Sequence, residues 1–323
     1  MNAKLNAVLF PLLVALVIFL PGNAISEEYI IAVLANRGLT VAEKEWNPTA
    51  EYLSAQVGHS FSVVPMDDTA LYNSVKNGKV DFFYTNSAMY VELSKLHNAR
   101  AIATLINRHK DNPLEEWGSA IIVKRESPVK TLADFRGKDF ICRGLTAFGG
   151  WLMAKRSFIE SGLDPEREFK SLRSTPTHDN VVYAVYNGAA DGGSVRTGTL
   201  EKMAADGKIK IEDFRVIQQV QDGFPLAHST KLYPEYPMAA CSHVPDSLAD
   251  AVAEALTALS PSQPAAAAAK ITGWKKPADY SPVTECLIIV QHGPYAGMDL
   301  PNRESESVKM PRKGGVAKRK ARE

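Results

Sequence analysis

The sequence lacks most features that mark a metalloprotein or an enzyme. Its 323 residues include only three cysteines, at positions 142, 241 and 286, whose spacing matches neither a metal-binding pattern nor a Cys-x-x-Cys pair. An odd number allows one disulfide at most within a monomer, and the pairing of Cys142, Cys241 and Cys286 stays open. No GxSxG, HExxH or phosphate-binding-loop motif is present. We therefore expect neither a metal nor a cofactor, and an enzyme is the less favoured class.

An excess of charge of one sign is also missing. Lysine and arginine total 37 and aspartate and glutamate total 36, so the net charge of +1 gives no reason to expect a nucleic-acid partner. The charge is unevenly distributed, because residues 303–323 carry about +5 and residues 25–302 about −5. Residues 301–323 also lack apolar periodicity, so they are predicted to form a disordered basic tail.

Long apolar runs are absent except at the N-terminus. Lys4 precedes fourteen mostly apolar residues, Ala7–Leu20, and small residues follow as far as Ala24. This pattern predicts a signal peptide at residues 1–24, removed after Ala24, and hence a mature protein outside the cytoplasm. A membrane anchor is the alternative, but a span needs about 18–20 apolar residues.

The remaining sequence alternates between strand-like and helix-like patterns. With 45% apolar and 23% charged residues it is typical of a globular protein. The helix after the first strand is predicted to begin at Asn47 as cap, with Pro48 in its first turn. Such repeats predict a parallel sheet with helices on its faces. The expected strands of this first unit are 29–34, 61–65, 80–84 and 101–106.

A second unit of the same kind follows the strand expected at 116–124. Residues 222–237 are rich in proline and indicate a hinge connection. The sequence thus predicts an α/β protein of two lobes joined by hinge strands, with a ligand cleft between them at the carboxyl ends of the strands. Lobe 1 is assigned to 25–125 plus 223–300, and lobe 2 to 126–222.

A glycine-rich loop in lobe 2 follows a predicted strand and leads into a helix. Glycines let a backbone approach a ligand closely, and free N–H groups at a helix start favour an anion. An ordinary tight turn is the alternative. The candidate ligand-binding residues here are Thr146, as helix cap and donor, with Phe148, Gly149, Gly150 and Trp151.

Further candidates follow other predicted strands. Arg196, with Thr197, suits an oxyanion, although a surface salt bridge is equally consistent with its position. His178 at a helix start suits a neutral hydrogen-bond donor, although a solvent-facing turn capped by Thr177 is the simpler interpretation. The candidates from lobe 1 and the hinge are Arg37, Tyr84, Thr85, Asn86 and Trp117.

Several separated motifs occur in a familiar order. The segments DFFYTNSAMYV (81–91), TLADFRGK (131–138), AFGGWLM (147–153) and THDNVVYAVYNGAADGG (177–193) resemble the phosphate/phosphite/phosphonate substrate-binding proteins of ABC transporters. The resemblance covers about residues 28–260 and implies a type II periplasmic-binding-protein fold. A closer resemblance, to the periplasmic sensor domain of tetrathionate-sensor-type histidine kinases, rests on GSVRTGTLEKMAADGKI (193–209), FPLAHSTKLYPEYPMA (224–239) and GWKKPADYSPVTECL (273–287).

The resemblance implies a periplasmic solute-binding protein that captures a small oxyanion in the interlobe cleft. Arg196 favours an anion without an amine, either phosphonate-like or a sulfur oxyanion. The expected partner is an ABC permease or a membrane sensor kinase, and a monomer is expected. One alternative is a detached or truncated sensor domain of a two-component histidine kinase. A less favoured one is a small-molecule enzyme with His178 as base.

Overall fold

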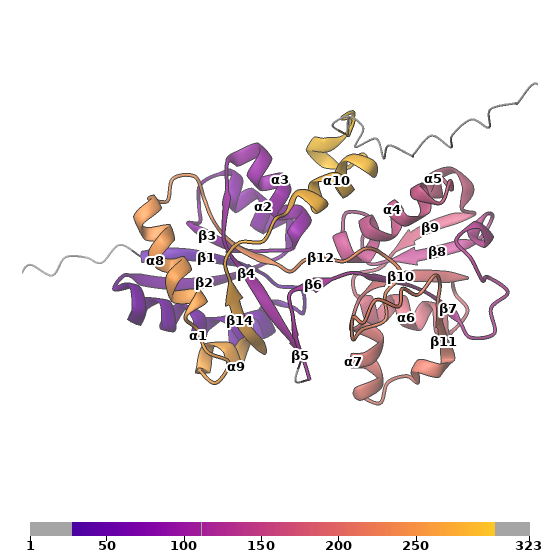
Figure 1. Cartoon of the computed structure of the whole chain (residues 1–323), viewed down its shortest axis with the longest axis horizontal. Helices are drawn as coiled ribbons and strands as arrows, with labels where there is room; N and C mark the ends of the chain where they lie inside the picture. Colours follow the sequence, from indigo (N-terminus) through magenta and orange to yellow (C-terminus); the bar gives the residue numbers. More distant parts are fainter. Residues whose placement is uncertain (1–27, 111, 301–323) are drawn as a thin grey trace, which may run out of the picture.

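The computed structural model describes residues 28–110 and 112–300 as two α/β lobes (Figure 1). The predicted signal peptide, 1–24, and the predicted basic tail, 301–323, lie outside the described residues. Within the described ranges, no helix has the length and apolarity needed to cross a membrane.

The first lobe is a mixed sheet covered by helices on both faces. Its strand order is β14-β4-β13-β3-β1-β2, with β5 paired to β4. The strands are β1 (Glu28–Leu34), β2 (Ser60–Met66), β3 (Phe82–Tyr84), β4 (Arg100–His109), β5 (Asn112–Leu114), β13 (Pro237–Ala240) and β14 (Ile271–Lys275). The helices are α1 (Leu39–Val57), α2 (Asp68–Lys76), α3 (Ser87–His97), α8 (Asp246–Thr257) and α9 (Pro264–Ala269).

The expected all-parallel arrangement holds only for part of this sheet. Strands β1, β2 and β3 are parallel, but β13 returns from the other lobe and lies between β3 and β4, antiparallel to both. The predicted start of α1 at Asn47 is wrong, since the helix begins at Leu39 and contains Pro48. Pro48 removes one backbone hydrogen bond. The helix nevertheless continues past Pro48, because the buried side chains of Ala42, Trp46 and Leu53 stabilise it on both sides of the proline.

The second lobe is a five-stranded sheet in the order β11-β7-β10-β8-β9. The strands are β7 (Ser119–Lys124), β8 (Asp139–Cys142), β9 (Ser171–Ser174), β10 (Gly192–Arg196) and β11 (Phe214–Val216). The helices are α4 (Met153–Glu160), α5 (Pro165–Glu168), α6 (His178–Tyr186) and α7 (Thr199–Ala205), and a π-helical turn, η2 (Phe148–Leu152), leads into α4.

Two short antiparallel strands, β6 (Glu116–Trp117) and β12 (Tyr233–Pro234), connect the lobes. The chain crosses at these strands, so β7, assigned above to lobe 1, belongs to the second sheet. Residues before β12 also lie with lobe 2, because the Ser229 amide donates to the Ser119 carbonyl at 2.8 Å. The predicted boundaries at 125 and 223 are therefore displaced by several residues. Gly118 interrupts the single strand expected at 116–124.

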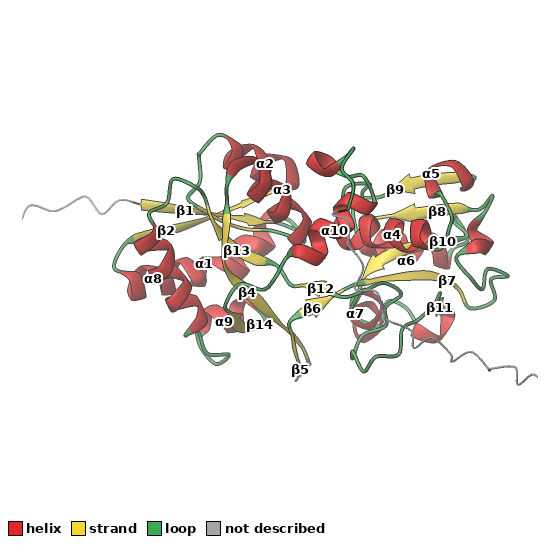
Figure 2. Ribbon diagram, turned by 45° about the horizontal axis from the view of Figure 1, so that its top comes forward, coloured by secondary structure: helices red, strands yellow, loops and turns green. Residues whose placement is uncertain are grey.

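The C-terminal helix α10 (Ser281–Ile289) packs against α3 of the first lobe and α4 of the second. Both overall views place it between the lobes (Figures 1 and 2). The larger of two core clusters also runs through both lobes, since Trp117, Phe148 and Tyr233 join the interior of the first lobe to that of the second.

Candidate ligand-binding site

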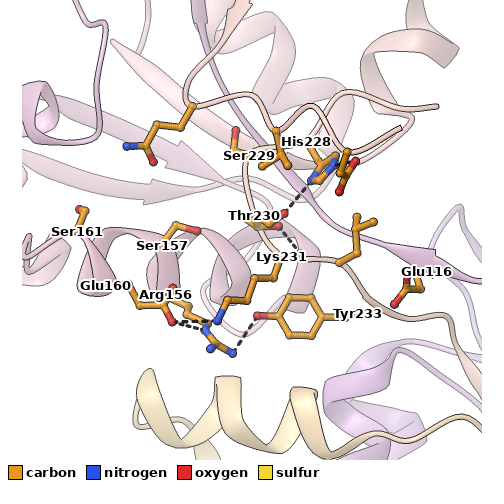
Figure 3. Close-up of a pocket in the computed structure, with 14 residues that line it drawn as sticks. Glu116, Arg156, Ser157, Glu160, Ser161, His228, Ser229, Thr230, Lys231 and Tyr233 are labelled. Carbon is orange, nitrogen blue, oxygen red and sulfur yellow. Dashed lines mark hydrogen bonds and ion pairs between the residues drawn. The ribbon is translucent and has the colours of Figure 1, made fainter. Parts of the chain in front are cut away.

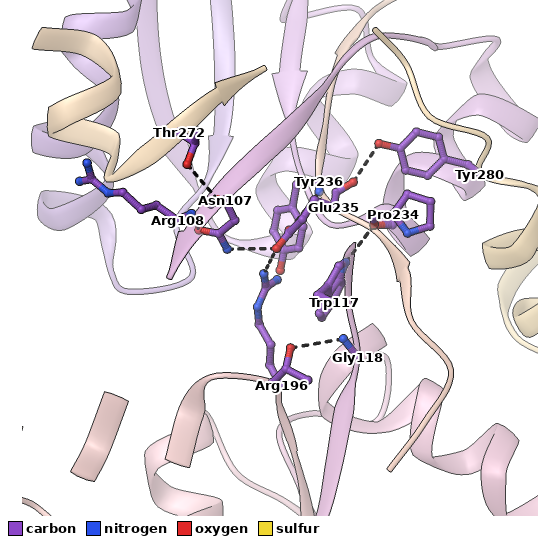
Figure 4. A network of polar contacts seen from close by, with 12 residues as sticks. Asn107, Arg108, Trp117, Gly118, Arg196, Pro234, Glu235, Tyr236, Thr272 and Tyr280 are labelled. Carbon is purple, nitrogen blue, oxygen red and sulfur yellow. Dashed lines mark hydrogen bonds and ion pairs between the residues drawn. The ribbon is translucent and has the colours of Figure 1, made fainter. Parts of the chain in front are cut away.

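Arg196 occupies the carboxyl end of β10 and points toward the first lobe (Figure 4). Its guanidinium carbon lies 4.1 Å from the centroid of the Trp117 ring and 5.0 Å from that of Tyr236. Nη2 donates to Glu235 Oε1 at 2.5 Å. Burial alone would lower the pKa of Arg196, but Glu235 and the neighbouring tyrosines raise it. The guanidinium therefore stays charged, and stacking and pairing fix its plane.

Glu235, which the sequence analysis did not identify, joins the two lobes at this point. Its side chain is 1% exposed and lies between β12 and β13. Besides Arg196 of the second lobe, Oε1 accepts from Nδ2 of Asn107 on β4 at 3.0 Å. A buried carboxylate needs such partners. The sequence did contain a signal for Glu235: it is an acidic residue between two tyrosines in the Tyr-Pro-Glu-Tyr-Pro segment of the predicted hinge.

Aromatic rings continue from Arg196 into the first lobe. Tyr84, at the carboxyl end of β3, packs against Tyr236 with centroids 5.5 Å apart. It also contacts Trp46 at 4.3 Å and Trp274 at 5.8 Å, two residues that the sequence analysis missed. Burial, reinforced by the charge of Glu235, raises the pKa of Tyr84 well above its ordinary value, so its hydroxyl remains protonated. These rings form a largely apolar wall beside the guanidinium.

His178 begins α6 directly behind Arg196. Its Nδ1 accepts a hydrogen bond from the Arg196 backbone amide at 3.3 Å, and Thr177 caps the helix through the Asn180 amide. Burial, together with the charges of Arg143 and Arg196, lowers the pKa of His178 to about 3. The ring is therefore neutral at physiological pH, with Nε2 carrying the proton, and is a weak base.

Arg143, also missed from the sequence, follows β8 and approaches the first lobe. Its Nη2 lies 3.6 Å from Oδ2 of Asp68 in the first turn of α2, so this ion pair spans the junction between the lobes. The same charge contributes to the lowered pKa of His178. Its position immediately after a strand is the signal that identified Arg196, and it applied equally here.

The glycine-rich loop serves packing within the protein. A Cβ on Gly149 would lie 2.1 Å from Cζ3 of Trp117, and one on Gly150 would lie 2.5 Å from the Arg143 carbonyl oxygen. Gly149 thus admits the indole that supports Arg196, and Gly150 admits the backbone of Arg143. Phe148 packs edge-on against Trp117 at 5.7 Å, whereas Trp151 is buried within lobe 2 against Phe140.

Thr146 does not cap the helix as expected. Ala147 occupies the N-cap position of η2 without a side-chain hydrogen bond, and Thr146 is exposed. Thr197 is buried beside Arg196, and its Oγ1 accepts from the Gly118 amide at 3.3 Å. Asn86 caps α3 by accepting from two backbone amides.

Arg37 lies at the edge of the Arg196 cluster. Its side chain is 55% exposed and pairs with Glu45 at 3.5 Å. Its charge nevertheless acts on Tyr84, whose pKa it lowers slightly against the larger effect of burial. Thr85 is fully buried after β3, and its hydroxyl contacts the Met89 sulfur at 3.1 Å. The structure therefore gathers Tyr84, Trp117, His178 and Arg196, with Arg37 at the edge.

A separate cavity of about 700 Å³ lies between α4 and the segment that leads into β12 (Figure 3). Its charged groups pair with one another: Glu160 accepts from Arg156 at 2.9 Å, and His228 contacts Asp222 at 3.2 Å. The Arg196 cluster is the better candidate for a ligand, because it lies at the carboxyl end of β10 and receives side chains from both lobes.

Comparison with known proteins identifies the family of the chain. The family model described as "ABC transporter, phosphonate, periplasmic substrate-binding protein" matches residues 31–281. The chain belongs to this family. The match confirms the resemblance seen in the sequence, and it makes this chain a member of a family of periplasmic solute-binding proteins rather than enzymes.

A curated relative of this chain is a larger protein. The tetrathionate sensor histidine kinase TtrS of Salmonella typhimurium strain LT2 is 33% identical over 266 residues, which are 82% of this chain and 44% of the relative. The chain thus spans less than half the length of that kinase.

Solved structures confirm the type II periplasmic-binding-protein fold. XAC2383 from Xanthomonas citri bound to ATP superposes with a TM-score of 0.66 at 15% identity, covering 82% of this chain and 97% of that one. PhnD1 from Prochlorococcus marinus, in complex with methylphosphonate, gives 0.63 at 14% identity, covering 80% and 97%. At these identities the likeness concerns the fold alone.

Proposed function

We propose that this protein binds a small, weakly hydrated oxyanion against Arg196, and that tetrathionate is the first ligand to test. The observation that carries the proposal is the Arg196 guanidinium, stacked on Trp117 and anchored by Glu235 at the junction between the lobes. Glu235 occupies only part of its hydrogen-bonding capacity, because a guanidinium carries five N–H donors. Tyr236 also interacts with the guanidinium, and the donors that neither residue uses can bind an anion.

Further positive charge supports an anionic ligand. Arg143 is partly exposed, and its 3.6 Å contact with Asp68 is long for an ion pair, so a ligand anion can replace that carboxylate at small cost. His178 is neutral, so it offers the anion a hydrogen-bond donor but no further positive charge. An anion between Arg143 and Arg196 would contact both the loop after β8 and the end of β10.

The surroundings favour a polarisable anion over a compact, strongly hydrated one. Phosphate and phosphonate groups need many directional donors to offset the loss of water. Buried hydroxyls near Arg196 already donate within the protein. These are Thr85 to the Met89 sulfur, Ser87 to the Pro234 carbonyl and Ser119 to the Val195 carbonyl. Aromatic side chains, which contact large apolar atoms such as sulfur well, supply much of the remaining wall.

The similarity to a tetrathionate sensor kinase agrees with this ligand class. We infer that the loaded protein is presented to a membrane partner, either an ABC permease or a sensor kinase. Deleting the gene separates these partners: loss of labelled-ligand uptake indicates the permease, and loss of ligand-dependent transcription indicates the kinase.

Titration calorimetry with tetrathionate, thiosulfate, methylphosphonate and phosphate tests the ligand. Tetrathionate is expected to bind most tightly, and Arg196→Gln to weaken it by about 30-fold or more. Arg136→Gln is the control, because Arg136 pairs with Glu168 at the same distance of 2.5 Å but in a more exposed position within the second lobe. Tighter binding of methylphosphonate, or retained affinity in Arg196→Gln, contradicts the proposal.

A further inference from the structure

Helix α10 and Arg196 are joined by an unbroken series of buried side chains. We propose that α10 responds to the state of Arg196 through this series, and therefore reports ligand occupancy to a partner that contacts α10. The part that concerns ligand occupancy rests on the function proposed above; the coupling itself does not. In order from Arg196, the side chains are Trp117, Phe148, Tyr233 and Arg156.

The first steps run through aromatic contacts. The Arg196 guanidinium stacks on Trp117 at 4.1 Å, and Trp117 meets Phe148 edge-on at 5.7 Å. Phe148 in turn contacts Tyr233 at 4.9 Å. Trp117 and Tyr233 are 2% and 1% exposed, and Gly149 leaves no free space beside the indole. Since the series has no gap, a displacement of Trp117 must be taken up by its neighbours.

The hinge lies within this series. Trp117 of β6 and Tyr233 of β12 are directly opposite each other in the two-stranded ladder that connects the lobes. Any rotation of one lobe against the other twists this ladder and shifts both rings. The Trp117 indole N–H also donates to the Pro234 carbonyl at 3.0 Å, so the ring cannot move independently of β12.

Arg156 connects the hinge to α10. Its side chain is 3% exposed, and Nη1 donates to the Tyr233 hydroxyl at 3.4 Å (Figure 3). Nη2 donates to Oε1 of Glu285 on α10 at 2.5 Å. A charged side chain buried to this extent is held by its partners, so motion of Tyr233 is transmitted to Glu285. Because α10 also packs on α3, it contacts both lobes.

Amide hydrogen exchange of α10 tests the coupling without any ligand. Arg196→Gln releases Trp117 and is expected to change exchange of residues 281–290 by about threefold or more. Arg136→Gln, which removes a more exposed ion pair of the same length within the second lobe, should leave α10 unchanged. An unaltered α10 in Arg196→Gln overturns the coupling, whether or not tetrathionate binds.

A reciprocal experiment starts from α10. Glu285→Gln is expected to change the affinity for tetrathionate by about threefold, since coupling between two sites is mutual. Its control is Glu166→Gln: Glu166 pairs at 2.5 Å with Lys155, the neighbour of Arg156 on α4. Equal affinities in both variants count against the coupling. If α10 responds to Arg196→Gln but the wild type does not bind tetrathionate, the coupling stands and the proposed ligand is wrong.

Discussion

Trp117 and Gly149, thirty-two residues apart in the sequence, occupy complementary space: the indole lies where a Cβ of residue 149 would be, 2.1 Å from Cζ3. The platform beneath Arg196 therefore depends on the absence of a side chain in another segment. We expect Gly149→Ala to displace Trp117, lower the free energy of unfolding by about 1–3 kcal/mol and weaken anion binding. Urea unfolding and calorimetry measure both effects.

The second variant Trp117→Leu provides the control for this prediction. Leucine is smaller than the indole, so in the Trp117→Leu background the added Gly149→Ala change should cost much less stability than it costs alone. Equal costs in the two backgrounds would show that the methyl group is accommodated without moving Trp117.

Glu235→Gln is expected to separate stability from affinity. The amide keeps a hydrogen-bond acceptor for Asn107 but leaves the Arg196 charge uncompensated, and breaking such a pair costs about 3 kcal/mol. At the same time a negative charge leaves the site, so tetrathionate should bind about tenfold more tightly. Weaker binding in this variant would contradict the prediction and show that the loss of the Arg196 anchor outweighs the removal of the negative charge.

His178 predicts a dependence of stability on pH. Its pKa is about 3 in the folded protein against an ordinary value of 6.5, so between these values the unfolded chain binds the extra proton. The contribution of His178 to stability is complete above pH 6.5 and declines on acidification, with a slope approaching about 1.4 kcal/mol per pH unit. Between pH 6.5 and 4, His178→Gln should reduce the slope of the unfolding free energy against pH. The same slope in the variant and the wild type contradicts the assignment.

All three cysteines are buried as free thiols in the described structure. Burial raises the pKa of Cys142 and of Cys241 to about 12, and that of Cys286 to about 11. The thiolate is the reactive form, so we expect no reaction with Ellman's reagent at pH 8 in the folded protein and three equivalents in guanidinium chloride. Fewer than three equivalents after unfolding would reveal a disulfide.

The sequence was informative where the signal is local. Arg196 was predicted at a strand end because it directly follows the strand expected at 189–195, and the two-lobed fold followed from alternating patterns. The start of α1 was wrong because Pro48 is typical of a first helical turn, whereas here a buried face outweighs its missing hydrogen bond.

The missing parts of the site are those that depend on contacts between distant segments. Glu235 lies in a proline-rich stretch without periodicity, and only its approach to Arg196 and Asn107 gives it a role. Trp46 and Trp274 look like ordinary core residues in the sequence, and only their ring contacts with Tyr84 connect them to the site. Gly149 and Gly150 were predicted as ligand-binding residues, whereas in the structure the groups that require their small size are Trp117 and the Arg143 carbonyl.

Glu235 also has a consequence for how this protein can diverge. Its carboxylate both sets the charge next to Arg196 and ties Asn107 of one lobe to Arg196 of the other. A substitution that adapts the site to a ligand of different charge therefore alters the force that holds the lobes together. In this protein, ligand preference and the ease of domain closure are inherited together.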